Sequence, residues 1–370
     1  MALKIVNIVG ARPNLIKMAP LMKAMGQVTD IEAVLLHTGQ HYDHAMSQIF
    51  FDELSLPEPD VFLNVGSASH AVQTAKIMVA FEQFALDWQP DLVLVVGDVN
   101  STLACAITAA KLNLPVAHVE AGLRSFDRTM PEEVNRIVTD ALSDLLFTTS
   151  QGANEHLLRE GIDPNKIFFV GNVMIDTLRE YQDQMSRLTI LDEFKVEPGN
   201  YLLLTLHRPG AVDNRDVFAG ILEAIKTIQH DIPIVFPVHP RTAKRIEEHN
   251  LTPLVRSMPN LTRIEPLPYL SMLHTMAHAK AVLTDSGGIQ EETTVLGVPC
   301  LTLRENTERP ITVTEGTNKV IGTRPERILA ETRHLLQAEL PPRTIPALWD
   351  GHTSERIVQI ICDKMITPGR

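Results

Sequence analysis

Short apolar runs rich in valine, isoleucine and leucine recur along the whole chain and constrain its fold most strongly. They begin with KIVNIV at 4–9 and end with NKVIGT at 318–323. Longer stretches with helical periodicity, such as 16–25 and 101–111, separate the runs. Strands that are apolar throughout are buried on both faces, which is typical of parallel sheets covered by helices. The sequence therefore predicts an α/β fold.

The length of the chain and one polar segment predict two domains. The 370 residues, of which 44% are hydrophobic, are enough to form two cores. The polar segment 180–200 separates two series of apolar runs, so we expect two Rossmann-like domains. The N-terminal domain is expected over 1–178 and the C-terminal domain over 179–352. A helix in 353–370 has a Thr/Ser cap and apolar residues at helical spacing, and we expect it to fold back on the first domain.

Charge and cysteine content narrow the class of protein. The net charge of −12 argues against a nucleic-acid or anionic-membrane partner, because such partners are bound by clustered Lys and Arg. The three cysteines are far apart and show neither metal-ligand spacing nor a disulfide framework. No apolar run approaches the ~18 residues of a membrane helix. We expect a cytoplasmic protein without a metal.

The stretch AVLTDSGGIQEE at 281–292 predicts half of a nucleotide site. Ser286, Gly287 and Gly288 follow a strand and open a helix, where bare N–H groups and the helix dipole attract phosphate. Glu292, two turns into this helix, is suited to hold a ribose diol. A glycine-rich turn that binds nothing explains the S-G-G motif equally well.

Two further segments offer cations to a diphosphate. Arg12 and Lys17 lie five residues apart after the first strand, where Pro13 favours a helix start. Arg309 lies in the RENTERP segment after a strand of the second half. Ordinary surface charge is the competing interpretation for all three residues.

Acidic and histidine side chains follow other strands. Asp98 ends VVGD, Glu120 ends VAHVE, and Glu132 stands beside Glu133 four residues before Arg136. Carboxylates gathered in one cleft raise one another's pKa, which suits proton abstraction from carbon. One of the Glu132–Glu133 pair is expected to be an exposed first-turn acid. Two histidines also follow strands, and a catalytic or phosphate-binding role is favoured for His207 over His239.

Ten motif blocks, in order along nearly the whole chain, resemble the non-hydrolysing UDP-N-acetylglucosamine 2-epimerases. The blocks are GARPNLIKMAPL, TGQHYD, GDVNSTLA, HVEAGLRS, MPEEVNR, GNVMIDT, TLHRPG, PVHPRT, TDSGGIQEE and TERP. The resemblance implies a two-domain, glycosyltransferase-B-like fold with its active site in the interdomain cleft. It also implies a homodimer that interconverts UDP-GlcNAc and UDP-ManNAc without a metal or nicotinamide cofactor.

The same resemblance implies a mechanism and a set of site residues. UDP is eliminated to give 2-acetamidoglucal and then adds back after protonation on the other face. By this resemblance, the residues that match the family's catalytic positions are Asp98, Glu120, Glu132 and His207. The residues that match its substrate and UDP contacts are Arg12, Lys17, Arg136, Ser286, Gly287, Gly288, Glu292 and Arg309.

Other interpretations remain open at this stage. HTGQHYD and RSFDRTMPEE also resemble the branch that acts on UDP-2,3-diacetamido-glucuronate, whose carboxylate Arg124, Arg128 or Arg208 could bind. The hydrolysing branch would release UDP and ManNAc, and a glycosyltransferase or a non-catalytic UDP-sugar sensor could share the fold. In several bacterial members a glutamine-containing segment binds an allosteric UDP-GlcNAc. The corresponding segment here, Gln40-His41-Tyr42-Asp43, departs from that pattern, which puts an allosteric UDP-GlcNAc site in doubt.

Overall fold

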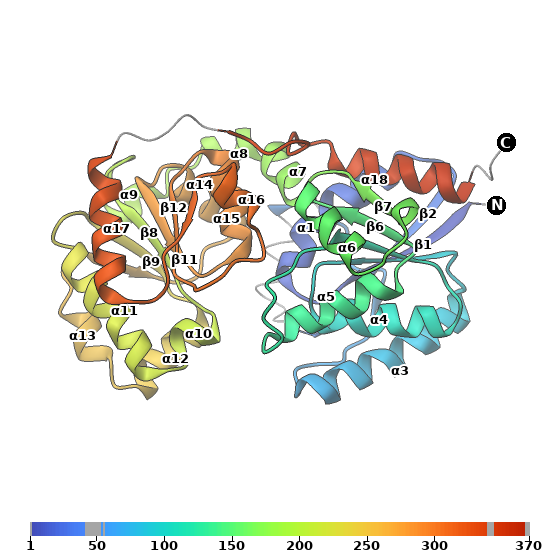
Figure 1. Ribbon diagram of the computed structural model, residues 1–370, viewed down its shortest axis with the longest axis horizontal. Helices are drawn as coiled ribbons and strands as arrows, with labels where there is room; N and C mark the ends of the chain where they lie inside the picture. The colour runs from blue at the N-terminus through green and yellow to red at the C-terminus, as the bar shows by residue number, and fades with distance from the viewer. Residues whose placement is uncertain (1, 41–52, 55, 339–343, 367–370) are drawn as a thin grey trace. The chain divides into compact units, whose positions relative to one another are not determined.

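The computed structural model describes residues 2–40, 53–54, 56–338 and 344–366 (Figure 1). Contacts divide the chain into two compact units. Unit 1 comprises Met1–Glu180 and Ala347–Arg370, and unit 2 comprises Tyr181–Pro346. Each unit has one parallel sheet and a buried apolar core of its own, so the predicted α/β class is confirmed.

The sheet of unit 1 has seven strands in the order β3-β2-β1-β4-β5-β6-β7, all paired in parallel. The direction of strand addition reverses between β1 and β4, and ligands bind beyond the carboxyl ends of strands at such a switch point. Every apolar run predicted in this part of the chain forms a strand. The strands are β1 (Leu3–Val9), β2 (Ile31–His37), β3 (Val61–Phe62), β4 (Leu92–Val96), β5 (Val116–Ala121), β6 (Leu145–Thr148) and β7 (Ile167–Phe169).

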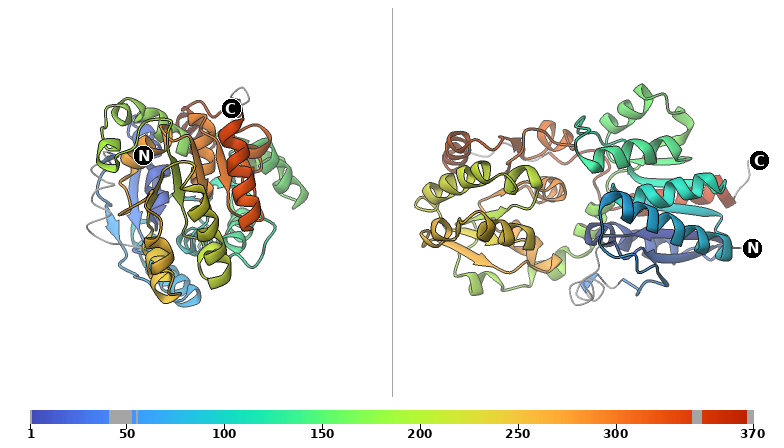
Figure 2. Two further views of the ribbon diagram at one scale, coloured as in Figure 1. Left: turned by 90° about the vertical axis from the view of Figure 1, so that its left-hand side faces the viewer. Right: turned by 90° about the horizontal axis from the view of Figure 1, so that it is seen from below.

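Helices cover both faces of this sheet (Figures 1 and 2). One layer is formed by α3, α4 and α5, which contact one another in sequence, and the other contains α1, α7 and α18. Apolar side chains of α3 and α4 meet those of the central strands and form the core on that side. The helices are α1 (Arg12–Met25), α3 (His70–Trp88), α4 (Asn100–Lys111), α5 (Pro131–Leu142), α6 (Gln151–Arg159), α7 (Val173–Glu180) and α18 (Thr353–Ile361). Two short turns are the 3-10 helix η1 (Pro164–Lys166) and the π-helix η2 (Cys362–Ile366).

Helix α18 is attached to unit 1 by a buried carboxylate. Asp176 of α7 accepts hydrogen bonds from the backbone N–H groups of Thr353 (3.1 Å) and Ser354 (2.6 Å). These groups open α18, where intrahelical acceptors are missing. Trp349, just before the helix, is 1% exposed and donates to the Thr149 carbonyl (2.9 Å). The last helix therefore packs against α1 and α7.

The sheet of unit 2 has six parallel strands in the order β10-β9-β8-β11-β12-β13. This is the Rossmann strand order, with its switch point between β8 and β11. The strands are β8 (Leu202–Thr205), β9 (Ile234–Pro237), β10 (Leu261–Ile264), β11 (Ala281–Thr284), β12 (Cys300–Thr302) and β13 (Asn318–Val320).

The helices of unit 2 also lie in layers. Helices α11 and α17 pack against each other, and α15 packs on β11, β12 and β13. The largest core of the unit joins α11 to the sheet. The helices are α8 (Gln182–Ser186), α9 (Leu191–Phe194), α10 (Pro209–Val212), α11 (Arg215–Ile228), α12 (Pro240–Glu248), α13 (Thr252–Arg256), α14 (Tyr269–Ala277), α15 (Gly287–Leu296), α16 (Ile311–Thr314) and α17 (Pro325–Gln337). Within the described ranges, no helix is long and apolar enough to cross a membrane.

Candidate active site

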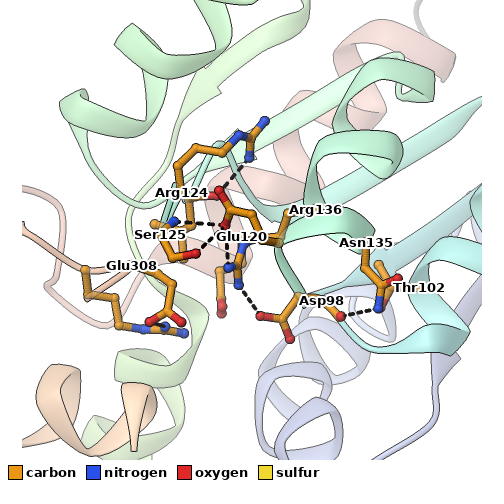
Figure 3. Close-up of polar contacts among 12 residues, drawn as sticks. Asp98, Thr102, Glu120, Arg124, Ser125, Asn135, Arg136 and Glu308 are labelled. Carbon is orange, nitrogen blue, oxygen red and sulfur yellow. Dashed lines mark hydrogen bonds and ion pairs between the residues drawn. The ribbon is translucent and has the colours of Figure 1, made fainter. Parts of the chain in front are cut away.

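Asp98 lies in the turn directly after β4, at the switch point of unit 1. Gly97 makes this turn with a left-handed φ of 71°. Arg136 Nη1 donates to Asp98 Oδ2 (2.5 Å), and Asn135 Nδ2 donates to the Asp98 carbonyl (2.8 Å; Figure 3). The Asp98 side chain is 25% exposed. Helix α5 therefore holds a carboxylate that solvent and substrate can still reach.

Glu120 stands near the end of β5 in a conformation that is costly for its residue type. Its φ is 73°, and the pairing of β5 with β6 shifts register between Val119 and Ala121. A non-glycine residue in this region costs about 1–3 kcal/mol, and such residues cluster at functional sites. The buried carboxylate forms an ion pair with Lys17 Nζ. A Cβ built on Gly97 would lie 3.5 Å from the same Nζ, so Lys17 also lies beside the Asp98 turn.

Glu133 anchors the loop between β5 and α5. Its carboxylate accepts hydrogen bonds from Ser125 N, Ser125 Oγ and Phe126 N, each 2.9 Å, and from Arg136 Nη2 (2.8 Å). Burial raises the pKa of Glu133, but these donors outweigh burial and lower it below its usual range. Arg136 thus joins Glu133 to Asp98. Glu132 lies in the same first turn and is half-buried, so the expectation that one of the two acids is exposed was wrong.

Arg12 is the first residue of α1 and is half-buried. The start of this helix is fixed by Asn14, whose Oδ1 accepts from Ala11 N (3.1 Å) and whose Nδ2 donates to the Val96 carbonyl (3.1 Å). The end of β4 and the start of α1 are therefore bonded together. This one junction sets the positions of three predicted site residues, Arg12, Lys17 and Asp98.

In unit 2 the segment 286–288 opens α15, as the sequence predicts, with Ser286 at the N-cap position. The Ser286 N–H donates to Thr284 Oγ1 (3.0 Å). A Cβ on Gly287 would lie 2.4 Å from Arg309 Nη1. The missing side chain at Gly287 thus lets the Arg309 guanidinium lie against the first turn of α15.

Buried glutamates fix the arginines around this helix start. Arg309 Nε lies 3.0 Å from Glu291 Oε1, and Arg309 Nη1 lies 3.6 Å from Glu308 Oε2. Glu308 also accepts two hydrogen bonds of 2.9 Å from Arg304 and lies 3.6 Å from Arg208 Nη1. Burial raises the pKa of Glu308, but Arg304 and the neighbouring guanidiniums lower it well below its usual range. The cations near α15 are therefore held in place by ionised carboxylates.

His207 follows β8 and is oriented by Asp285. Its Nδ1 lies 2.9 Å from Asp285 Oδ1, and Asp285 Oδ2 accepts from the backbone N–H of His207 (2.8 Å) and Arg208 (2.7 Å). The His207 side chain is 37% exposed, whereas Asp285 is fully buried. Because a carboxylate faces Nδ1, this nitrogen carries the hydrogen and Nε2 is the ring atom left for a ligand. His239 instead caps α12, where its Nδ1 accepts from Arg241 N (3.2 Å).

Glu292 lies in α15 and is 6% exposed. The fully buried Tyr269 of α14 contacts this carboxylate. Burial raises the pKa of Tyr269 well above its usual value, and the negative Glu292 raises it further. Tyr269 therefore stays a hydrogen-bond donor to Glu292.

The structure brings several of the predicted residues together within each unit, and it places Arg12 and Glu132 in the first turns of α1 and α5. In unit 1 it joins Lys17 to Glu120 and Arg136 to Asp98, and in unit 2 it gathers His207, Ser286, Gly287 and Arg309 near the start of α15. Sequence reasoning singled out Glu133 and the strand-end residue Asp285 but not their supporting roles, and it missed Glu291 and Glu308. Both missed glutamates lie within a helix or loop, where an acidic residue gives no sign of burial.

Two further expectations concern an allosteric ligand and a metal ion. His41, Tyr42 and Asp43 lie outside the described residues, so the prediction about an allosteric site stays a prediction. Gln40 is buried, and its Oε1 accepts from Ser101 Oγ (2.7 Å). In the part of the chain that the structure describes, no group of three or more His, Cys, Asp or Glu side chains could hold a metal ion.

His37 at the end of β2 makes the stability of the protein depend on pH. The ring stacks on Phe62 with centroids 4.8 Å apart, and its Nδ1 accepts from Gly39 N (2.9 Å). Burial lowers the pKa of His37 from 6.5 to about 4. Between these two values the unfolded chain binds a proton that the folded chain does not, so stability falls as the pH drops through this window. Urea unfolding at pH 7 and pH 4.5 should differ by about 2–3 kcal/mol because of this group.

His37→Phe, which preserves the stack, should remove that part of the pH dependence. His352→Phe replaces a histidine whose side chain is 60% exposed and serves as the matched control. Equal pH slopes for His37→Phe and the parent would contradict a neutral buried His37.

Two Rossmann-like sheets with polar residues at their switch points define a two-domain, glycosyltransferase-B-like fold. The model of the family described as UDP-N-acetylglucosamine 2-epimerase matches residues 23–362. A UDP-N-acetylglucosamine 2-epimerase of Methanocaldococcus jannaschii is 44% identical over 364 residues, which cover 97% of this chain and 99% of that relative. The chain belongs to the UDP-N-acetylglucosamine 2-epimerase family, as its motifs predicted.

A solved structure and a relative of different specificity are also similar to this chain. The crystal structure of the Methanocaldococcus jannaschii UDP-GlcNAc 2-epimerase in complex with UDP-GlcNAc and UDP has a TM-score of 0.90 at 43% identity, covering 97% of this chain and 99% of that one. A UDP-2,3-diacetamido-2,3-dideoxy-D-glucuronate 2-epimerase of Pseudomonas aeruginosa is 39% identical over 334 residues, 90% of this chain and 92% of that relative.

Proposed function

We propose that this protein interconverts UDP-GlcNAc and UDP-ManNAc by inverting C2 of the sugar. The observation that carries the proposal is Glu120, a buried carboxylate in a left-handed conformation that is paired with Lys17 beside the Asp98 turn. Strain of this kind at an ionisable side chain marks a catalytic position. Membership of the family supplies the substrate class.

The reaction has to remove a hydrogen that no neighbouring ring carbonyl acidifies. The C1–O bond breaks with its electron pair leaving on UDP, the C2–H proton passes to a carboxylate, and the C1=C2 double bond of 2-acetamidoglucal forms. Protonation of C2 from the opposite face and return of UDP to C1 complete the inversion. Both faces of the sugar at C2 need a group that carries a proton, and the leaving diphosphate needs stabilisation as its charge develops.

The residues of unit 1 suit the proton transfers. Asp98, Glu120 and Glu132 are the proposed proton carriers, with the assignment of faces left to experiment. Lys17 pairs with the Glu120 carboxylate and Arg136 pairs with that of Asp98, so each carboxylate is held in place by a cation. Arg136 and Arg12 are also proposed substrate contacts.

The residues of unit 2 suit the uridine diphosphate. N–H groups of Ser286, Gly287 and Gly288 are the proposed diphosphate contacts, together with Arg309 and the His207 ring. Glu292, oriented by Tyr269, is the proposed ribose contact. A helix start, a guanidinium and an imidazole together stabilise a leaving group that gains negative charge.

The contacts of the candidate cations favour UDP-GlcNAc over the diacetamido-glucuronate substrate. Arg124 is 1% exposed and lies 2.7 Å from Asp140 and 2.6 Å from Glu160. Arg208 lies near the buried Glu308. Among the three predicted cations, Arg128 alone is exposed, and an exposed loop arginine is a weak selector for a bound uronate.

Phosphorus NMR of the protein with UDP-GlcNAc tests the proposal. We expect a second UDP-sugar to accumulate to a constant ratio without free UDP. Accumulation of UDP and free ManNAc would assign the hydrolysing reaction instead. Turnover of the diacetamido-glucuronate and not of UDP-GlcNAc would assign the alternative substrate.

We further propose that the protein is a homodimer, an expectation that rests on the family resemblance. Helix α3 supports it with a stripe of apolar residues at seven-residue spacing, Val72, Val79 and Leu86, which are 47%, 70% and 56% exposed. Such spacing suits the pairing of two helices. Val79→Glu should shift the mass measured by light scattering from dimer toward monomer, and Leu158→Glu on α6 is the matched control. A monomeric parent protein would contradict the homodimer, and an unaffected dimer would exclude this stripe.

A further inference from the structure

A buried histidine and aspartate join the turn that carries Asp98 to the turn that follows Glu120. His118 of β5 and Asp140 of α5 are both fully buried, with His118 Nδ1 2.6 Å from Asp140 Oδ1. His118 Nε2 lies 2.8 Å from the Gly97 carbonyl oxygen. Asp140 Oδ2 accepts from Gly122 N (3.1 Å). The His118–Asp140 pair therefore contacts the residue before Asp98 and the turn just after Glu120.

Both turns have backbones that need external support. Gly97 and Gly122 have φ values of 71° and 77°, and Glu120, near the end of β5 and just before the second turn, has a φ of 73°. A left-handed non-glycine residue persists only where surrounding contacts fix it. The His118–Asp140 pair supplies such contacts through its hydrogen bonds to the Gly97 carbonyl and the Gly122 N–H.

The geometry also defines the contacts of the ring. One ring nitrogen of His118 faces a carboxylate and the other faces a carbonyl oxygen, and both partners are hydrogen-bond acceptors. Burial raises the pKa of Asp140, but His118 and Arg124 outweigh it and lower that pKa below its usual range. Arg124 lies 2.7 Å from Asp140 and is shared with Glu160, so Asp140 is held by His118, Arg124 and the Gly122 N–H.

We propose that His118, held by Asp140, is a positioning residue that fixes the spacing of the Asp98 and Glu120 carboxylates for epimerisation. This inference rests on the proposed function. Neither side chain touches the substrate, so the pair acts through the Gly97 carbonyl and the Gly122 N–H. Stability alone is a weak reason for such a group, because buried ion pairs add little over apolar packing. Displacement of a reacting group by about 1 Å lowers turnover by about 100-fold.

Two amide substitutions separate positioning from stability. His118→Asn places its NH₂ at the place of Nδ1, so it keeps the bond to Asp140 and loses the bond to Gly97. His118→Gln places its NH₂ at the place of Nε2, so it keeps the bond to Gly97 and weakens the pairing of Asp140. We expect His118→Asn to lower kcat about 100-fold with UDP affinity within twofold of the parent. His118→Gln should retain more turnover although it is the less stable variant.

The order of the two variants decides between the interpretations. If turnover follows stability, so that His118→Gln is the less active variant, the pair is merely structural. A folded His118→Asn with parental kcat overturns the proposal by itself, even if His118→Gln fails to fold. The ¹⁵N spectrum of histidine-labelled parent protein needs no variant: hydrogen bonds at both ring nitrogens are expected for His118, and a ring that makes no hydrogen bond to the Gly97 carbonyl overturns the proposal. Absence of epimerisation by the parent protein contradicts the proposed function, while this spectrum still tests the pair.

Discussion

Glu120→Gln is expected to lower the turnover of UDP-GlcNAc by about 10³-fold while UDP affinity stays within a few-fold of the parent. Glutamine preserves the size and the left-handed backbone but cannot accept a proton from C2. The uridine diphosphate contacts proposed for unit 2 are unchanged in this variant. Initial rates by NMR and UDP titration by calorimetry measure the two quantities separately.

Glu155→Gln is the matched control for this change. Glu155 is a glutamate of unit 1 on α6 whose side chain is 61% exposed and pairs with Arg159. Its turnover should equal that of the parent. Parental turnover in Glu120→Gln would remove Glu120 from the proton carriers, and a loss of UDP affinity without a loss of kcat would make it a binding residue.

Lys17→Met should have the largest effect on stability. The Lys17 and Glu120 side chains are 7% and 2% exposed, so methionine removes the cation from a buried carboxylate. Breaking a buried pair in this way costs about 3–5 kcal/mol. Turnover should fall as well, because the Glu120 carboxylate loses the cation that holds it in place. Urea unfolding and NMR rates measure the two effects.

The double variant Lys17→Met/Glu120→Gln isolates the pair. Since it contains no buried charge at this place, it should be more stable than Lys17→Met alone. The sequence analysis predicted Lys17 as a diphosphate contact. A stable Lys17→Met variant with weakened UDP binding would favour that role over the pairing with Glu120.

The strands could be predicted because their burial leaves a continuous apolar signal. Each apolar run recognised in the sequence forms a strand. Two edge strands were missed: β3 has only two residues, and β10, LTRI, includes Thr262 and the exposed Arg263 and lacks a continuous apolar run. The helix start at 286–288 was predictable because Ser286 and two glycines directly follow an apolar strand, a pattern typical of a strand-to-helix turn.

The partners of the site residues could not be predicted in the same way. Lys17 in the sequence is a cation near a strand end, and only the folded junction of β1, α1 and β4 directs it to Glu120. Glu133 and Asp140 occupy helical positions where polar side chains are usually solvated. Their burial depends on donors from the β5–α5 loop and from His118, which are brought near by tertiary packing. Sequence reasoning therefore finds groups at strand ends and misses the network that fixes them.

The most direct test of the account is proton and phosphorus NMR of the protein with UDP-GlcNAc in D₂O. Inversion through elimination and reprotonation predicts UDP-ManNAc that carries deuterium at C2, with no accumulation of free UDP. UDP-ManNAc that keeps the original hydrogen would contradict proton exchange at C2. Absence of any conversion would contradict the proposed epimerase activity itself.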